Sequence, residues 1–144
     1  DAVIDYKQQD LVEAVMEWTG GRGVDIALDT VGPEVFQASI PAVAHYGDLV
    51  TLLDPSAVKG GAIDWKEARN RNLRIGFELM LTPLLRDLPE ARAHQGEILR
   101  QCAEWIDAGR LKIQVGGTYP LEHAAEAHRL IEEGHVQGKL VLTL

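Results

Sequence analysis

The residues best placed to do chemistry are Asp29, Thr30, Val31 and Gly32, which follow the mostly apolar run 24–28. That run has the composition of a largely buried parallel strand, and the proline after Gly32 suits the first turn of a helix. Ligands of open α/β sheets bind outside the carboxyl ends of the strands, so this junction is a candidate ligand-binding loop. The alternative is structural, with Asp29 or Thr30 capping the helix by accepting its free N–H groups. The two roles are compatible.

Other kinds of reactive site find little support in the sequence. The five histidines form no metal-binding pattern. His123 and His128 would point about 140° apart on a helix. A single cysteine, Cys102, cannot form an internal disulfide or a multi-thiolate zinc site, and we expect a buried, unreactive thiol. No serine lies in a G-x-S-x-G motif, which would support a hydrolase. We therefore expect neither a catalytic residue nor a zinc or other metal site in this chain.

The composition is that of a globular chain of about one domain. Of the 144 residues, 46% are hydrophobic and 25% are charged, which are ordinary values for such a protein. A formal net charge of −8 and scattered basic residues argue against a nucleic-acid partner. No apolar run approaches the roughly 18 residues of a membrane span, and no signal peptide is recognisable. We therefore expect a cytoplasmic protein with no membrane partner.

Short apolar runs alternate with stretches of helical periodicity along the chain. The β-α-β-α-β order up to residue 53 favours parallel strands with right-handed crossovers, so the predicted fold class is α/β. Pro41 should kink or shorten its helix, and Ile98, Leu99 and Ile106 should face inward from theirs. The expected elements are a strand at 2–4, a helix at 8–18, a strand at 24–28, a helix at 33–47, a strand at 48–53, a short helix within 57–72, an edge strand at 73–81, a helix at 91–108, a strand at 111–115, irregular chain at 116–120, a helix at 121–133 and a strand at 139–144.

Three stretches resemble the medium-chain dehydrogenase/reductase superfamily, nearest its zinc-independent NADPH:quinone oxidoreductase branch. The resemblance covers nearly the whole chain, and the stretches occur in the family's order and spacing. They are Gly-Arg-Gly-Val-Asp at 21–25 with Asp-Thr-Val-Gly at 29–32, Val-Ala-His-Tyr-Gly at 43–47 running into the strand at 48–53, and an ending with Tyr-Pro-Leu at 119–121, Ala-His-Arg at 127–129 and Gly-Lys-Leu-Val-Leu at 138–142.

The resemblance implies a partial Rossmann domain, that is, strands three to six of a doubly wound parallel sheet. Residues 1–115 would form this partial dinucleotide-binding domain, beginning at its third strand. Residues 116–144 would be the helix–strand segment that in the family returns to a barrel-like catalytic domain. No strand followed by G-x-G-x-x-G occurs in the sequence, so the usual pyrophosphate turn is missing. The glycines at 20–23 precede a strand and are expected only to shape a turn.

The resemblance also implies residues that contact NADP or NAD in a complete enzyme. Val31 and Gly32 would line the cofactor groove. Leu52, Leu53 and Asp54 would lie beside the nicotinamide ribose, mainly through backbone contacts. Apolar side chains at these positions are also what ordinary core packing requires, so the two interpretations stay open.

Two further segments complete the predicted cofactor contacts. The backbone of Phe77, Glu78 and Leu79 would meet the nicotinamide amide, and Lys139 would approach a phosphate or ribose. The alternatives are an ordinary edge strand for the first segment and a solvated lysine at the start of a strand for the second.

As a function, the resemblance implies the C-terminal portion of an NAD(P)H-dependent oxidoreductase. In the complete protein a hydride would pass between nicotinamide and a small-molecule substrate, either a quinone, an enone/carbonyl or an alcohol. We expect the fragment alone to be inactive. The alternative is a non-catalytic α/β binding or dimerisation module. The exposed edges left by absent strands and the apolar strand at 75–81 predict a homodimer or higher homo-oligomer.

Overall fold

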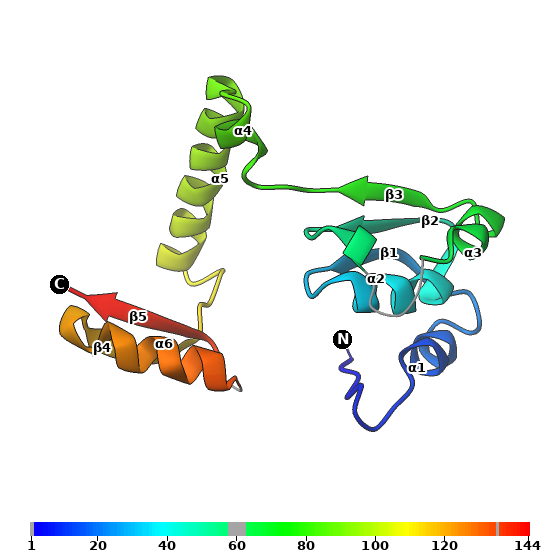
Figure 1. The fold of residues 1–144 in the computed structure, drawn as a ribbon, viewed down its shortest axis with the longest axis horizontal. Coiled ribbons are helices and arrows are strands. Elements are labelled where there is room, and N and C mark those ends of the chain that lie inside the picture. Colours follow the sequence, from blue (N-terminus) through cyan, green and yellow to red (C-terminus); the bar gives the residue numbers. More distant parts are fainter. Residues whose placement is uncertain (1, 58–62, 135) are drawn as a thin grey trace. The chain divides into compact units, whose positions relative to one another are not determined.

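A computed structural model describes residues 2–57, 63–134 and 136–144 (Figure 1). The chain divides into two compact units, Asp1–Leu85 and Arg86–Leu144. In the part of the chain described, unit 1 holds a sheet of strand order β1-β2-β3, and unit 2 holds the pair β4-β5. Every strand pairing among the described residues is parallel. The predicted α/β class is confirmed.

Between Leu11 and Phe77, unit 1 alternates helices and strands in the order that the sequence predicts. The helix predicted at 8–18 begins only at Leu11, because the side chain of Asp10 caps it by accepting the Glu13 N–H at 2.9 Å. The elements are α1 (Leu11–Trp18), β1 (Val24–Asp29), α2 (Pro33–Ser39), the 3₁₀ helix η1 (Ile40–Ala42), β2 (Val43–Thr51), the 3₁₀ helix η2 (Pro55–Ala57), α3 (Trp65–Asn70), β3 (Arg74–Phe77) and α4 (Thr82–Leu85).

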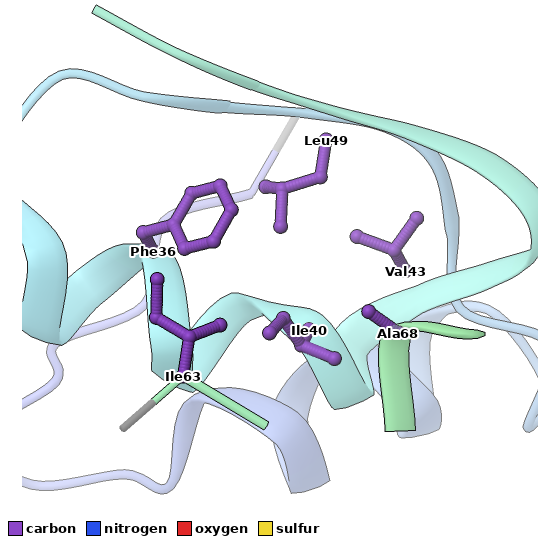
Figure 2. Packing of buried hydrophobic residues seen from close by; sticks show 6 residues of the cluster. All are labelled: Phe36, Ile40, Val43, Leu49, Ile63 and Ala68. Atoms are coloured by element: carbon purple, nitrogen blue, oxygen red, sulfur yellow. The ribbon is translucent and has the colours of Figure 1, made fainter. Parts of the chain in front are cut away.

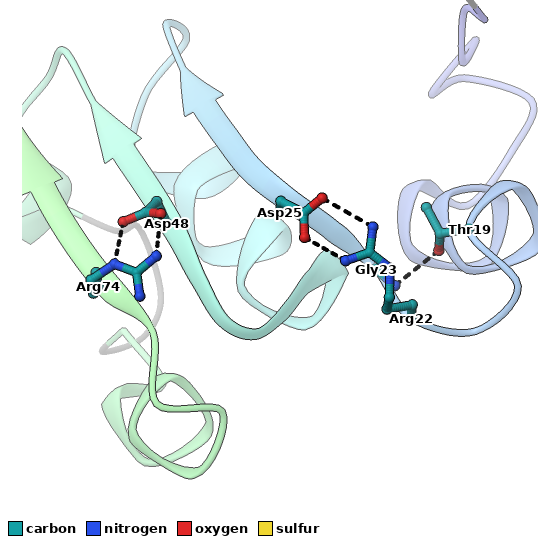
Figure 3. A network of polar contacts seen from close by, with 6 residues as sticks. All are labelled: Thr19, Arg22, Gly23, Asp25, Asp48 and Arg74. Carbon is teal, nitrogen blue, oxygen red and sulfur yellow. Dashed lines mark hydrogen bonds and ion pairs between the residues drawn. The ribbon is translucent and has the colours of Figure 1, made fainter.

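The glycine turn between α1 and β1 depends on backbone conformations and close packing that favour glycine. Gly23 has φ +83°, and its N–H donates to the Thr19 hydroxyl at 2.9 Å (Figure 3). A Cβ added to Gly23 would lie 2.7 Å from the Ala42 carbonyl oxygen. Only glycine therefore combines this backbone conformation with such a close approach to the following segment.

Pro41 shortens its helix as predicted, and more severely. Regular α2 ends at Ser39, and Ile40–Ala42 continues as a single 3₁₀ turn. A proline inside an α-helix removes one backbone donor and clashes with the preceding turn. The predicted helical end at 45–47 is wrong, because these residues belong to β2.

The hydrophobic core of unit 1 lies between the sheet and helices packed on one of its faces. Figure 2 shows side chains from α2, η1 and α3 meeting side chains from β2. The buried cluster consists of Phe36, Ile40, Val43, Leu49, Ile63 and Ala68.

The other face of this sheet is open within unit 1. Ile26 and Leu28 are 67% and 60% exposed, and they lie in register with Asp48 and Val50 of β2. Near-complete burial of the strand at 24–28 was predicted, and this is wrong. Successive residues of a strand point to opposite faces, so covering one face buries only alternate residues.

Two further strand predictions need correction in unit 1. Residues 2–4 form no strand, and Val3 is 91% exposed, because no described strand lies beside them to complete a ladder. The predicted strand at 73–81 ends at Phe77. The chain then turns into α4, with the Thr82 N–H donating to the Leu79 carbonyl at 2.9 Å. Its predicted place at a sheet edge is confirmed, since β3 pairs only with β2 among the described strands.

Unit 2 contains a long helix and a β-α-β crossover. The expected strand at 111–115 and irregular chain at 116–120 are both wrong, because one strand covers Val115–Pro120. A Cβ at Gly116 would lie 2.3 Å from the Gln137 carbonyl oxygen, so glycine here allows two chain segments to approach closely. The elements are α5 (Pro89–Asp107), β4 (Val115–Pro120), the 3₁₀ helix η3 (Leu121–His123), α6 (Ala124–Glu133) and β5 (Lys139–Thr143).

Helix α5 does not bury the residues predicted to face inward. It has no buried residue within unit 2: Ile98, Leu99 and Ile106 are all exposed, and Cys102 is only partly buried. The helical spacing predicts the helix correctly. Burial depends on a packing partner, which helical periodicity does not reveal.

Candidate functional site

A hollow of about 270 Å³ lies where β2 and β3 end. We call it the strand-end cleft. It is made by the chain just after each strand, and six of the nine residues predicted to contact a cofactor line it. Its lining residues are Thr51, Leu52, Leu53, Asp54, Pro55, Phe77, Glu78 and Leu79.

The parallel pairing of β2 with β3 brings these two segments together. Thr51 and Phe77 are partners in the register, and the Glu78 N–H donates to the Thr51 carbonyl at 3.0 Å. Because parallel strands end at the same edge of a sheet, the two exits share one side of unit 1.

A buried pair, Asp29 and Thr51, lies beneath the cleft. The Thr51 hydroxyl donates to Oδ2 of Asp29 at 2.8 Å. Asp29 is only 2% exposed and Thr51 only 1%. Oδ1 of Asp29 accepts the N–H groups of Val31 and Gly32, each at 3.0 Å. Asp29 therefore organises the loop before α2 and does not cap the helix itself, whose N-cap is Gly32. Thr30 is exposed.

The same pair also holds the loop that follows β2. The Leu53 N–H donates to the Thr51 hydroxyl oxygen at 3.2 Å, and the Leu52 N–H donates to the Asp29 carbonyl at 3.1 Å. A Cβ added to Gly32 would lie 3.9 Å from Cδ1 of Leu53. Val31 and Gly32 thus adjoin the cleft without being part of its lining.

The cleft is mostly apolar and has two acidic residues in its lining. Leu52, Leu53 and Phe77 present partly exposed apolar side chains, while Asp54 and Glu78 contribute carboxyl groups. Hydrogen bonds from the hydroxyl and then the backbone N–H of Ser56 lower the pKa of Asp54 below its ordinary value. Among the described lining residues none is basic. The cleft therefore suits a ligand with an apolar ring and hydroxyl donors better than it suits a phosphate.

Lys139, the remaining predicted contact, belongs to unit 2. It is the first residue of β5, its side chain is exposed, and its backbone N–H donates to the Gln114 carbonyl at 2.9 Å. Its role toward a phosphate or ribose stays a prediction.

Sequence reasoning missed the importance of Thr51. The available signal was a hydroxyl residue within the apolar run at 49–53, one strand away from the carboxyl group of Asp29. Polar residues inside a buried strand are found mostly where they are hydrogen-bonded, and this pair fits that rule.

Sequence comparison relates this chain to known dehydrogenases and reductases. A family model described as zinc-binding dehydrogenase matches residues 1–142. The 2-haloacrylate reductase of Burkholderia sp is 30% identical over 146 residues, covering 96% of this chain and 40% of that protein. Quinone oxidoreductase 1 of Escherichia coli (strain K12) is 29% identical over 142 residues, covering 97% and 42%. The chain thus spans about two fifths of the length of these curated relatives.

Solved structures support the fold. An alcohol dehydrogenase superfamily protein from Novosphingobium aromaticivorans superposes with a TM-score of 0.81 at 24% identity, covering 95% of this chain and 41% of that one. An NAD-dependent alcohol dehydrogenase superposes with a TM-score of 0.70 at 33% identity, covering 96% and 36%.

Across residues 2–57, 63–134 and 136–144, no group of three or more His, Cys, Asp or Glu residues could hold a metal ion. In the same ranges no helix is both long and apolar enough to cross a membrane.

Proposed function

Because the chain belongs to the zinc-binding dehydrogenase family of the medium-chain dehydrogenase/reductase superfamily, we propose that it forms part of the cofactor-binding domain of an NAD(P)H-dependent oxidoreductase. The observation that carries the proposal is the strand-end cleft. Six residues expected at a nicotinamide cofactor gather there, at the edge of the sheet where open α/β proteins bind ligands. We further propose that residues 1–115 act as the partial dinucleotide-binding domain and 116–144 as a segment of the catalytic domain.

The cleft would hold the nicotinamide–ribose end of the cofactor. Its volume of about 270 Å³ lies just below the ~300–1,000 Å³ typical of pockets for drug-sized ligands, so it accommodates a ring and a sugar but not a whole dinucleotide. Leu53 and Phe77 offer apolar surface for the ring, and the carboxylate of Asp54 can accept hydrogen bonds from ribose hydroxyls. The two acidic residues in the lining disfavour the pyrophosphate.

The bound cofactor would supply the chemistry. The names of the relatives suggest the class of substrate. When bound, the reduced nicotinamide supplies a hydride, that is, a proton with two electrons. The relatives' names point to a quinone or to an alkene conjugated with a carboxylate, so we propose an electron-poor quinone or activated alkene as substrate. Such a substrate takes up the hydride and then one proton, which completes a two-electron reduction.

The chain's own part in this reaction is to bind and orient. Because the sequence has no strand followed by G-x-G-x-x-G, we propose that turnover needs a further segment that supplies the pyrophosphate site and the substrate pocket. The chain alone should bind a nicotinamide compound weakly and without turnover.

Competition calorimetry with four ligands tests the proposal. We expect NADH, NADPH and reduced nicotinamide mononucleotide to bind with dissociation constants within about tenfold of one another, since all share the end that the cleft recognises. ADP-ribose, which lacks nicotinamide, should not compete.

A pair of variants ties that binding to the cleft. L53D places a charge on the lining and should abolish binding, whereas L84D changes a leucine of α4, 59% exposed and outside the cleft, and should leave it unchanged. Tight binding of ADP-ribose alone, or equal loss in both variants, would contradict the proposal. Absence of all binding together with a stable dimer would favour a non-catalytic module.

A further inference from the structure

The two loops beside the strand-end cleft are held by one buried pair of side chains. Asp29 ends β1 and Thr51 ends β2, and they are partners in the register of the sheet. Their side chains meet through the 2.8 Å hydrogen bond from the Thr51 hydroxyl to Oδ2 of Asp29. Both are almost fully buried, so water cannot readily replace a lost partner.

Each member of the pair also binds the backbone of a different loop. Asp29 accepts the N–H groups of Val31 and Gly32 through Oδ1. Thr51 accepts the Leu53 N–H through its hydroxyl oxygen. The side chains therefore tie the loop after β1 to the loop after β2. No described strand pairing includes Val31, Gly32 or Leu53.

The loop after β1 needs such a restraint because its backbone is unusual. Gly32 has φ +146° and ψ −172°, a region that only glycine visits readily. It is also buried, and α2 begins at the next residue. A glycine has many alternative conformations, so an ordered loop here requires its N–H to be held.

We propose that Asp29 and Thr51 act as positioning residues that set the conformation of both loops and thereby the shape of the strand-end cleft. The consequence for ligand affinity rests on the proposed nicotinamide site, whereas the consequence for loop order does not. Asp29 is not a lining residue of the cleft, and the polar side-chain atoms of both residues are engaged with each other and with loop amides. They act through Gly32 and Leu53.

The proposed role of Thr51 can be tested with variants that keep or remove its hydroxyl. A hydroxyl has one proton and two acceptor sites, and here the proton goes to Asp29 while an acceptor site takes the Leu53 N–H. T51V keeps the shape of the side chain but can do neither. T51S keeps both bonds. D29N retains an acceptor for the loop amides and can donate to the Thr51 oxygen, so it should preserve the arrangement.

A hydroxyl at the other end of β1 provides a matched control. Thr19 donates to the Val15 carbonyl at 2.7 Å and accepts the Gly23 N–H at 2.9 Å. T19V therefore removes a bridging hydroxyl of the same kind, in a turn outside the cleft.

The experiment measures backbone amide hydrogen exchange and NADH affinity in the full 144-residue chain. In the wild type, the amides of Val31, Gly32 and Leu53 should exchange as slowly as those inside β2. T51V should speed their exchange by about tenfold or more, the scale of one lost buried hydrogen bond, and weaken NADH binding by a similar factor. T51S and D29N should restore both to within about threefold, and T19V should affect Gly23 but not the loops.

The possible results separate the two proposals. Rapid exchange of the three loop amides in the wild type would overturn the positioning role even if T51V failed to fold. Unchanged exchange in T51V, or faster exchange with unchanged NADH affinity, would also overturn it. If the wild type binds no nicotinamide compound but T51V still frees the loops and T51S restores them, the positioning role stands and the proposed function fails.

Discussion

Asp48 of β2 and Arg74 of β3 face each other across the sheet and form a two-point ion pair (Figure 3). Arg74 Nε donates to Asp48 Oδ1 at 2.7 Å, and Nη2 donates to Oδ2 at 2.5 Å. The two residues are partners in the strand register. The hydrogen bonds and the charge of Arg74 lower the pKa of Asp48 below its ordinary value. This pair links β3, the strand that completes the strand-end cleft, to the centre of the sheet.

We expect this ion pair to stabilise unit 1 only while Asp48 is ionised. A carboxyl whose pKa is lowered by folding contributes stability above its unfolded pKa, about 3.9, and loses it as pH falls through the native value. Urea unfolding should show D48N to be less stable than the wild type at pH 7. The difference should shrink below about pH 4 and vanish at lower pH.

Salt provides the control for that prediction. The side chains are partly exposed, so added salt should reduce the difference between D48N and the wild type at pH 7. A difference that persisted unchanged at low pH and at high salt would show that packing, and not the ion pair, is responsible.

Gly23 should tolerate substitution far less well than Gly20. Both have positive φ, +83° at Gly23 and +62° at Gly20. A Cβ added to Gly23 would lie 2.7 Å from the Ala42 carbonyl oxygen, whereas a Cβ added to Gly20 would have no non-neighbouring atom within 4 Å. G20A should cost about 1 kcal/mol for its left-handed backbone, and G23A about 2–4 kcal/mol because a clash with main chain is added. Thermal unfolding of the two variants measures this, and equal losses would argue against the close approach.

Gly32 should be required for its backbone conformation and not for space. The nearest atom to an added Cβ is Leu53 Cδ1 at 3.9 Å, an ordinary contact. G32A should nevertheless destabilise the loop by roughly 1–3 kcal/mol and weaken nicotinamide binding. Calorimetric titration of G32A with NADH gives the outcome, and wild-type affinity would show that the φ of +146° is unimportant to the cleft.

The open edge of β3 should promote self-association. Among the described strands β3 pairs only with β2, which leaves one row of its backbone groups available to another chain. Phe77 on this strand is 65% exposed. Light scattering should show a dimer or larger species for the wild type and a monomer for F77K, because a charged residue at an edge opposes pairing.

The matched control is I113K, at a residue that is 53% exposed and outside every described strand. A wild-type monomer at high concentration, or dissociation by both variants alike, would contradict association through the β3 edge.

The sequence predicted those features that depend on local patterns. The run at 24–28, the proline at the start of α2 and the shortening effect of Pro41 all follow from residue type and spacing. The β-α-β-α-β order predicted parallel strands up to residue 53, and β1 and β2 are parallel. The parallel pairing of β3 with β2, which brings their exits to one edge, lay outside that prediction. The residues assigned to the cofactor came from the family resemblance.

Features that depend on distant partners escaped prediction. Gly116 and Gly117 have the composition of a turn, yet they lie in β4 because glycine also lets neighbouring segments approach closely. The role of Thr51 becomes visible only beside Asp29, 22 residues earlier. The exposure of Ile26 reflects what covers the sheet, which strand periodicity does not reveal.

Titration of the ¹⁵N-labelled chain with NADH shows whether the strand-end cleft recognises the nicotinamide end of the cofactor. We predict saturable chemical-shift changes at the amides of 31–32, 52–54 and 77–79, with reduced nicotinamide mononucleotide shifting the same amides and ADP-ribose leaving them unchanged. Saturable shifts confined to other segments, or the same shifts with ADP-ribose, would contradict recognition of nicotinamide by the cleft.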